Sequence, residues 1–400
     1  MKIDPRKIYP LKGTVQHYAW GGHEFIPALL GIDNTKDQPF AEYWMGAHRS
    51  APSTLAEGEA RTDLKQVLAS EPALMGSAVQ QRFGELPYLL KVLDVKHMLS
   101  IQVHPTREGA ESGFAAEEAA GVDINASNRN YKDRNHKPEV MIALSGFWLL
   151  HGFKQPAAVK ATLHQVPQFR ELLAVFGEGN YKELYTHVME LPQQKLDEIL
   201  LPVVQKEVRR RTFHESEPGE PGYWVGEYYL DKKAEQIDRG IFAIYLLNLV
   251  QLQAGEAIFQ AAGIPHAYLR GQNIELMANS DNVLRGGLTT KHIDVSELVK
   301  HTRFTPVEPE ILHGSAAGAI RDFRFPVPDF AVSEITLSGT RQAKFDAASP
   351  EILFCLEGKA MVSAANELQM GSGDSCIVFA GNSYIVSAEQ GCRIFRAYVP

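Results

Sequence analysis

Apolar and polar residues alternate along a short segment that begins at Ser100. Successive side chains of a β-strand point to opposite faces, so Ile101 and Val103 would face a core. Ser100, Gln102 and His104 would then share the other face. A hydroxyl, an amide oxygen and an imidazole on one face predict half of a metal site, and the rest of the chain can be searched for the other half.

The neighbouring sequence contains several apolar runs that have the length of a β-strand. They cover residues 88–95, 99–103, 140–144 and 147–150, and a Ser-Gly turn dipeptide separates the last two runs. Residues 121–136 between them are polar and rich in Asn, Asp and Arg. This composition predicts a long surface loop, and loops of that length inside a domain are often functional.

The pattern becomes helical between residues 155 and 235. Apolar residues recur at helical spacing in two places, namely Phe169, Leu172, Leu173 and Phe176, and then Leu196, Ile199, Leu200, Val203 and Val204. We expect Pro202 to kink or split the second of these helices. The stretch 215–222, rich in Glu, Gly and Pro, would form a flexible connection. Residues 155–235 are therefore predicted to be a helical insertion.

From residue 241 we expect strands again, as far as the C-terminus. Residues 255–266 can be laid on residues 373–384 without a gap, because both read Gly, acid, small residue, apolar strand, Ala-Gly and turn. Such self-similarity suggests two copies of one β-unit, and the alternative is a chance likeness of two hairpins. In a true repeat His266 corresponds to Tyr384, so the first copy could bind a metal and the second could not.

Repeated antiparallel strands with Gly-rich turns favour a sandwich or a barrel. The Gly-x-Pro-His sequence that ends at His266 is typical of cupin barrels, in which metal ligands line the interior. We therefore predict a mainly β fold with two cupin-like β-barrel or jelly-roll units and an inserted α-helical domain. The catalytic unit would comprise residues 1–154 and 236–305, the insertion residues 155–235, and the second, metal-free unit residues 306–400.

Composition narrows the class of protein. Of the 400 residues, 44% are hydrophobic and 22% are charged, and the formal net charge of -8 argues against nucleic-acid or membrane-surface binding. It leaves room for a small anionic ligand held by local cations. The three cysteines form no CxxC motif, the N-terminus lacks an apolar signal region, and the strongest apolar run is about half a membrane span. We expect a cytoplasmic protein.

Four residues form a candidate metal-binding set, namely Gln102, His104, Glu139 and His266. Glu139 opens an apolar strand, where a carboxylate is costly to bury without a cation. One amide oxygen, one carboxylate and two imidazoles suit a borderline divalent ion, zinc first. Each residue alone is more often structural, and only the combination favours a site.

A second candidate set is basic, and its members are Lys91, Lys137, Arg285 and Lys291. Lys91 interrupts an otherwise apolar strand, and Lys137 would share a strand face with Glu139. Several cations near one metal would suit a phosphorylated substrate, and the glycines after Arg285 would let backbone N–H groups approach an anion. Taken singly, each cation is more often a solvated side chain.

At these motifs the sequence resembles the type I mannose-6-phosphate isomerase family. The resemblance spans residues 14–305 in the family's order. Its motifs are Tyr18-Ala-Trp-Gly-Gly22, Glu42-Tyr-Trp-Met-Gly-Ala-His48, Gln102-Val-His-Pro105, His136-Lys-Pro-Glu139, Gly263-Ile-Pro-His-Ala-Tyr268 and Asn279-Ser-Asp-Asn-Val-Leu-Arg-Gly-Gly-Leu-Thr289. The C-terminal third is less diagnostic but fits a second cupin-like unit.

The resemblance implies one zinc ion held by Gln102, His104, Glu139 and His266. It also implies functional roles for other residues, which are catalysis by Arg285, Lys137 and His136, acidic site positions at Glu275 and Asp281, and phosphate contacts at Ser100, Lys91 and Lys291. The partner would be a small sugar phosphate. We expect a monomer, with an oligomer left open.

The family's reaction interconverts mannose 6-phosphate and fructose 6-phosphate. A proton-transfer route between C1 and C2 passes through a cis-enediol(ate), whose charge zinc and Arg285 would stabilise. The sequence does not rank Glu275, His136 and Lys137 as the general base. Two rival hypotheses remain, an iron-dependent cupin oxygenase and a non-catalytic sugar-binding cupin, and neither explains the basic set beside the metal ligands.

Overall fold

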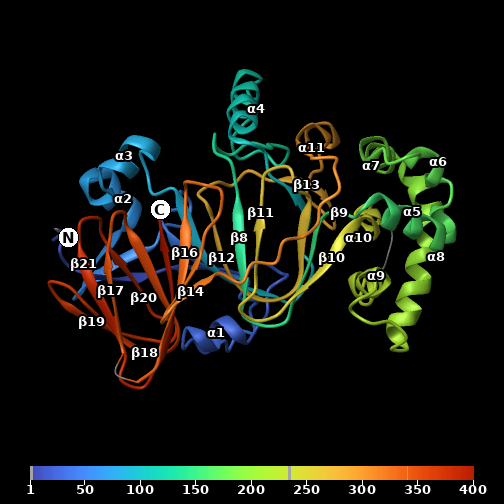
Figure 1. The fold of residues 1–400 in the computed structure, drawn as a ribbon. Coiled ribbons are helices and arrows are strands. Elements are labelled where there is room, and N and C mark those ends of the chain that lie inside the picture. The colour runs from blue at the N-terminus through green and yellow to red at the C-terminus, as the bar shows by residue number, and fades with distance from the viewer. Residues whose placement is uncertain (1–2, 233–235, 340) are drawn as a thin grey trace.

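Antiparallel strand pairing organises most of the chain into two large sheets, with helices at their edges and ends (Figure 1). The protein is represented by a computed structural model that describes residues 3–232, 236–339 and 341–400. No helix within these ranges is long and apolar enough to cross a membrane. The fold is mainly β, as the alternating patterns predict.

The first sheet contains strands from both ends of the chain. Its strands are β1 (Tyr9–Lys12), β4 (Thr54–Glu57), β5 (Ala60–Asp63), β14 (Ser315–Ala317), β15 (Ile320–Phe323), β16 (Ala331–Leu337), β17 (Gln342–Asp346), β18 (Glu351–Ser363), β19 (Glu367–Gly371), β20 (Ser375–Val378), β21 (Ser383–Ser387) and β22 (Cys392–Tyr398). β1 joins the sheet by pairing with β20, where Tyr9 lies opposite Ile377. The predicted division placed residues 1–154 in the catalytic unit, whereas β1, β4 and β5 hydrogen-bond within this sheet.

The second sheet carries the candidate site. Its strands are β2 (Thr14–Gln16), β3 (Glu42–Gly46), β6 (Tyr88–Val95), β7 (Ile101–Val103), β8 (Glu139–Ala143), β9 (Phe147–Phe153), β10 (Leu247–Leu252), β11 (Ala257–Gln260), β12 (His266–Ala278) and β13 (Leu284–Gly287). The long strand β12 pairs with β6, β7, β8 and β9. It therefore brings together segments far apart in sequence.

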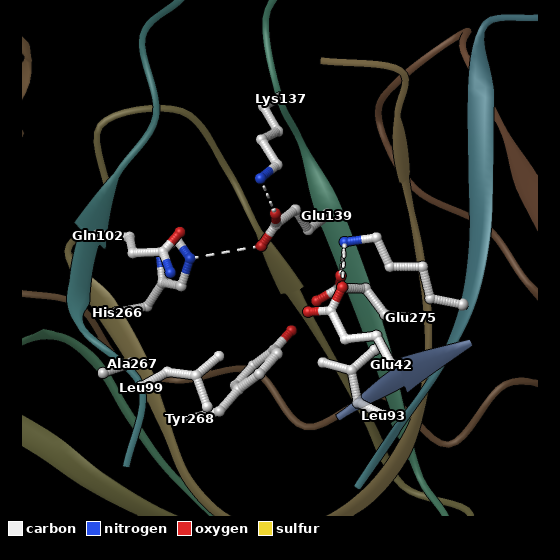
Figure 2. Close-up of a pocket in the computed structure, with 11 residues that line it drawn as sticks. Glu42, Leu93, Leu99, Gln102, Lys137, Glu139, His266, Ala267, Tyr268 and Glu275 are labelled. Atoms are coloured by element: carbon white, nitrogen blue, oxygen red, sulfur yellow. Dashed lines mark hydrogen bonds and ion pairs between the residues drawn. The ribbon is translucent and has the colours of Figure 1, made fainter. Parts of the chain in front are cut away.

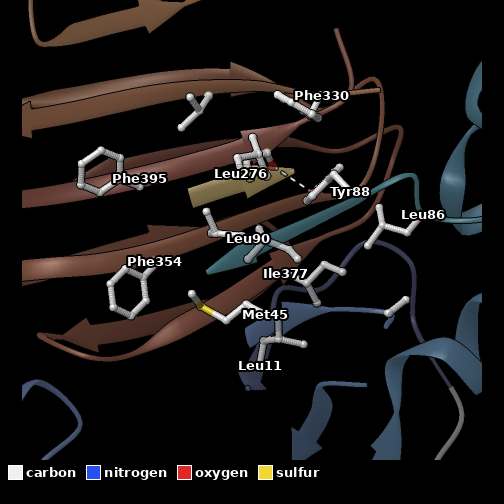
Figure 3. Packing of buried hydrophobic residues seen from close by; sticks show 14 of the residues in the cluster. Leu11, Met45, Leu86, Tyr88, Leu90, Leu276, Phe330, Phe354, Ile377 and Phe395 are labelled. Atoms are coloured by element: carbon white, nitrogen blue, oxygen red, sulfur yellow. Dashed lines mark hydrogen bonds between the residues drawn. The ribbon is translucent and has the colours of Figure 1, made fainter. Parts of the chain in front are cut away.

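The two sheets pack face to face through one large apolar cluster (Figure 3). Leu90 and Leu276 of the second sheet meet Phe354, Ile377 and Phe395 of the first. Each of these side chains is 0% exposed. Because side chains alternate along a strand, burying this face of β6 and β12 turns the intervening residues toward the opposite side of the sheet.

That alternation explains how a charged residue sits inside an apolar strand. Leu90 and Val92 of β6 pack into the core between the sheets, so Lys91 points the other way. On β12, Ile274 and Leu276 do the same and turn Glu275 away from the core. The strand register places Lys91 directly opposite Glu275.

Helices α5 to α10 form a cluster at the end of the molecule remote from the C-terminal strands (Figure 1). They are α5 (Pro156–Gln165), α6 (Leu172–Phe176), α7 (Tyr181–Glu190), α8 (Gln193–Thr212), α9 (Pro221–Tyr229) and α10 (Ile241–Leu246), with a 3-10 turn at Pro167–Phe169. The other helices are α1 (Phe25–Leu29), α2 (Leu64–Ser70), α3 (Ser77–Phe83), α4 (Arg107–Ala119) and α11 (Val295–His301), with a 3-10 turn at Pro72–Met75.

Two local predictions can be compared with the structure. Of the kink or split predicted at Pro202, the split does not occur, because α8 runs through Pro202 and Leu200 and Val203 on either side are held in the buried helical cluster. Residues 241–246, expected as strand, form α10, all of whose side chains are buried. An apolar run gives no periodicity when every face of the segment is covered, so pattern alone does not separate a buried helix from a buried strand.

One pair of strands in each sheet has the same register. Gln260 pairs with Glu139 across β11 and β8, and Val378 pairs with Glu351 across β20 and β18. Laying residues 255–266 on 373–384 superposes Gln260 on Val378, so Glu351 falls at the position of Glu139. By the same alignment Tyr384 falls at the position of His266.

Phe354→Ala should destabilise the protein by about 3–5 kcal/mol, since it removes a ring from the core between the sheets and leaves a cavity. Urea unfolding followed by circular dichroism measures this. Phe213→Ala, which truncates a ring that is 64% exposed, should change the free energy of unfolding by less than about 0.5 kcal/mol. Equal effects of the two substitutions would contradict the proposed packing.

Candidate active site

Three buried ligand-type side chains converge from three different strands. His104 directly follows β7, while Glu139 and His266 are the first residues of β8 and β12. Their exposed fractions are 1%, 4% and 3%. One nitrogen or oxygen atom from each lies within 4.8 Å of those from the other two.

Backbone hydrogen bonds fix the orientation of both imidazoles. The carbonyl oxygen of Asn282 lies 2.9 Å from His104 Nδ1, and that of Ile264 lies 2.8 Å from His266 Nδ1. A carbonyl only accepts, so each Nδ1 carries the proton and each Nε2 presents a lone pair. Burial lowers the pKa of His104 to about 4, which keeps this ring neutral near pH 7.

Each imidazole approaches a different oxygen of Glu139 at a distance that neighbouring ligands of one metal ion would have. His104 Nε2 lies 3.4 Å from Glu139 Oε1, and His266 Nε2 lies 3.4 Å from Glu139 Oε2. Tetrahedral bonds of about 2.0–2.1 Å place neighbouring ligand atoms roughly 3.3 Å apart. His104 Nε2 is buried without a hydrogen-bond partner. An unpaired buried acceptor is costly, and a cation would satisfy it.

Figure 2 shows Gln102 beside His266 and Lys137 beside Glu139. Gln102 lies directly opposite His266 in the pairing of β7 with β12, so its amide shares the face of that imidazole. Lys137 Nζ lies 3.4 Å from Glu139 Oε1. Burial disfavours an ionised Glu139, whereas the charge of Lys137 beside it favours ionisation, and the pKa of Glu139 lies well below its ordinary value.

A second charged cluster adjoins the triad around Lys91, which is 5% exposed. Its Nζ lies 3.0 Å from Glu275 Oε2 and 3.7 Å from Glu42 Oε2. It also lies 5.0 Å from the ring centre of Trp44, whose indole N–H donates to Glu42. Burial raises the pKa of Glu275, and Lys91 only partly offsets this shift.

Two connected spaces lead from these clusters toward solvent. An inner cavity of about 50 Å³ is lined by Lys91, Gln102, Lys137, Glu139, His266 and Glu275, together with Glu42, Tyr268 and several apolar residues. An outer cleft of about 720 Å³ shares Glu42, Lys91, Gln102 and Lys137 with it. That volume is in the range of small-molecule sites.

The outer cleft has an acidic and a basic portion. Asp281 Oδ1 lies 3.1 Å from Nε2 of the buried His48. Burial opposes ionisation of Asp281, but the bond to His48 prevails and lowers the pKa of Asp281 to about 2. Arg285 and Lys291 line the cleft from β13 and the loop after it. Burial lowers the pKa of Lys291, and repulsion from Arg285 adds to the shift.

Comparison with known proteins identifies the family to which this chain belongs. The model of the type I phosphomannose isomerase catalytic domain matches residues 8–156, and that of the mannose-6-phosphate isomerase cupin domain matches residues 319–399. The chain is 38% identical to the mannose-6-phosphate isomerase of Shigella flexneri, over 97% of this chain and 98% of that protein. The chain belongs to the type I phosphomannose isomerase family.

Family members with known structure have the same fold. A solved mannose 6-phosphate isomerase from Salmonella typhimurium, bound to fructose 6-phosphate and zinc, matches 98% of this chain and 99% of its own, with 37% identity and a TM-score of 0.86. The rat mannose-6-phosphate isomerase is 31% identical over 98% of both chains. The likeness thus extends over the whole described chain.

The structure brings most residues that sequence analysis singled out into this part of the phosphomannose isomerase fold. The metal-binding set and Lys91, Lys137 and Glu275 surround the inner cavity or triad, and Ser100, Asp281, Arg285 and Lys291 line the outer cleft. His136 differs, because it lines neither space. Its Nε2 lies 2.9 Å from Asp329 Oδ1, and Asp329 is 0% exposed.

Sequence analysis gave no role to several residues that the structure places here. Glu42 carried a usable signal, because it opens an apolar strand just as Glu139 does. Tyr268 stands two positions after His266 and so shares its strand face. His48 gave no comparable signal, because its partner Asp281 is 233 residues away.

Lys91→Met should destabilise the fold by about 3–5 kcal/mol at pH 8, since two buried carboxylates lose their cation. The pKa of Glu275 would rise further above its unfolded value. Protonation removes the penalty, so the difference from wild type should shrink as the pH falls from 8 to 5.

Urea unfolding of wild type and Lys91→Met at both pH values measures this. Lys195→Met is the matched control, since Lys195 pairs with Glu198 at the surface with both side chains more than half exposed. Such pairs contribute at most about 1 kcal/mol. A Lys91→Met penalty that is small, or that does not vary with pH, would contradict the charge pairing.

Proposed function

We propose that this protein is a zinc-dependent aldose–ketose isomerase that interconverts mannose 6-phosphate and fructose 6-phosphate. The observation that carries the proposal is the buried triad of His104, Glu139 and His266, whose ligand atoms lie within 4.8 Å of one another and whose His104 Nε2 is buried without a hydrogen-bond partner. Family membership and the zinc-bound and fructose 6-phosphate-bound relative support it. Gln102 is the proposed fourth ligand.

Charge balance in the inner cavity supports a divalent cation. When ionised, the three carboxylates that line it, Glu42, Glu139 and Glu275, face two ammonium groups, Lys91 and Lys137. One negative charge among these lining residues is therefore without a cation. Neutral imidazoles do not supply it. A doubly charged ion would overcompensate by one unit, which suits a substrate that develops negative charge.

The cations that line the outer cleft support the proposal of an anionic substrate. Lys291 is the proposed phosphate cation, because burial and then repulsion from Arg285 lower its pKa, and an anion beside it would offset both effects. Ser100 lines the same cleft and is the proposed hydroxyl contact. The family resemblance implies that Lys91 contacts the phosphate as well. Its ion pairs with Glu42 and Glu275 favour a role in orienting the acid–base machinery.

The proposed reaction moves a proton between C1 and C2 of the open-chain sugar. A base removes the proton from C2 of the aldose, giving a cis-enediol(ate), and the same group returns it to C1, while the proton of the O2 hydroxyl passes to O1 and O2 becomes the ketone oxygen. Zinc bound by the triad would supply Lewis-acid stabilisation of the developing oxyanion. Arg285 would add a fixed positive charge from the cleft wall.

Glu275 is the proposed base among the three candidates. Lys91 binds its Oε2, which orients the carboxylate in the cavity, and burial raises its pKa toward that of a sugar-phosphate isomerase base. Lys137 is proposed to donate to a substrate oxygen beside Glu139. His136, tied to Asp329, is proposed to orient its neighbour Lys137, and Asp281 to contact a sugar hydroxyl.

For the fold, we propose two cupin-like barrel units of common descent, of which only the first binds metal. The shared hairpin register supports this, because Glu351 and Tyr384 stand where Glu139 and His266 stand. In the C-terminal unit, however, Arg396 donates two hydrogen bonds of 2.5 Å to Glu351, and Tyr384 donates a third. A guanidinium there neutralises the carboxylate.

A coupled assay tests the activity. Purified protein with zinc should convert mannose 6-phosphate to fructose 6-phosphate, a chelator should abolish turnover, and added zinc should restore it. Activity only with iron and consumption of oxygen would favour the oxygenase alternative. No turnover by zinc-replete, folded protein would favour the non-catalytic alternative and sink the proposed function.

Zinc stoichiometry tests the assignment of the site to one unit. Glu139→Gln should lower bound zinc from one ion per chain to nearly none, because it removes the anionic ligand. Glu351→Gln, the matched substitution in the C-terminal unit, should leave one zinc per folded chain. Elemental analysis after gel filtration measures both. Loss of zinc in Glu351→Gln alone would contradict the assignment.

A further inference from the structure

The end of β13 and the loop after it have an unusual backbone. Together they run from Arg285 to Lys291 along the wall of the outer cleft. Gly287 has φ of 130° and Leu288 has φ of 55°, and a leucine in the left-handed region is held there only by its surroundings. Something outside the loop must therefore impose this shape.

Asp238 supplies that constraint. Its Oδ1 accepts hydrogen bonds from the backbone N–H groups of Gly240 (2.7 Å) and Leu288 (2.8 Å), and its Oδ2 accepts one from Thr289 (3.0 Å). The carboxylate thus bridges two segments about 50 residues apart in sequence. Its half-buried position makes these bonds to a charged acceptor stronger than those at an exposed turn.

Backbone packing reinforces the bridge. A Cβ atom added to Gly240 would lie 2.6 Å from the backbone nitrogen of Leu288, and one added to Gly287 would lie 2.3 Å from Gly240 Cα. The segment around Asp238 and the loop are therefore in direct backbone contact. Tyr229, the last residue of α9, fixes Asp238 in turn, because its hydroxyl accepts from the Asp238 N–H at 2.7 Å.

We propose that Asp238 is a positioning residue for binding of the substrate phosphate. It fixes the loop so that Lys291 is presented to the anion, and through Tyr229 it makes this loop depend on the helical insertion. The inference rests on the proposed function, in which Lys291 meets the phosphate. It assigns to the insertion a role in substrate binding, which sequence analysis did not find.

The sign of the effect separates positioning from simple electrostatics. Asp238 is an anion beside a basic loop, so by charge alone its removal would strengthen binding of an anion. If Asp238 positions the loop, its removal should weaken binding despite the gain in net positive charge. A general loss of stability predicts no specific change in phosphate affinity.

The test compares three variants of the full, zinc-loaded chain. Asp238→Ala removes all three hydrogen bonds. Asp238→Asn keeps an oxygen for Gly240 and Leu288 but turns an amide N–H toward that of Thr289. Asp63→Ala is the matched control, since Asp63 accepts from the backbone N–H of Gln66 at the start of α2, in a different part of the fold. KM for mannose 6-phosphate and the dissociation constant of inorganic phosphate, by calorimetry, are measured below the melting temperatures.

Asp238→Ala should raise both constants about tenfold, equivalent to about 1.4 kcal/mol, with a smaller increase for Asp238→Asn and none for Asp63→Ala. Unchanged or tighter phosphate binding in Asp238→Ala would overturn the inference. If that variant does not fold, unchanged phosphate binding in Asp238→Asn would overturn it. Absence of turnover in the wild type would defeat the proposed function instead, and the calorimetric comparison would still decide the role of Asp238.

Discussion

Glu139 imposes the constraint on which the site depends, because a carboxylate that is 4% exposed requires compensating positive charge. Its surroundings supply two imidazoles and one lysine, Lys137, each at 3.4 Å. Three strands must bring these groups together, and β12 does so by pairing with the other strands of the site. The strand register, the orientation of the two imidazoles and the Lys91 cluster together form the surroundings of one buried anionic centre.

The C-terminal unit meets the same constraint in another way. Glu351 is 1% exposed and stands where Glu139 stands in the hairpin register. Arg396 forms a bidentate pair with it, and the phenol of Tyr384 takes the position of His266. A guanidinium provides charge and hydrogen bonds but offers no open coordination position. On our proposal, substrate or water adds to the ion of the first unit as a further ligand, and the second unit is structural.

Sequence analysis predicted the features that follow from local residue patterns. Strand alternation predicted the face shared by Gln102 and its neighbours, and the apolar neighbours of Lys91 singled it out as a candidate site residue. It failed at Ile241, where a fully buried helix shows no amphipathic period. The clamp by Asp238 and the contact of His48 with its distant partner join segments 50 and 233 residues apart. Such pairings are fixed by tertiary packing, so no local sequence pattern predicts them.

The central claim is that a divalent ion compensates the buried charge of Glu139. Anomalous X-ray diffraction from zinc-loaded crystals, recorded at the zinc absorption edge, tests it most directly. We predict one strong anomalous peak per chain, about 2.0–2.2 Å from His104 Nε2, His266 Nε2 and a Glu139 oxygen. No peak at that position, or a peak beside Glu351 in the C-terminal unit, would contradict the account.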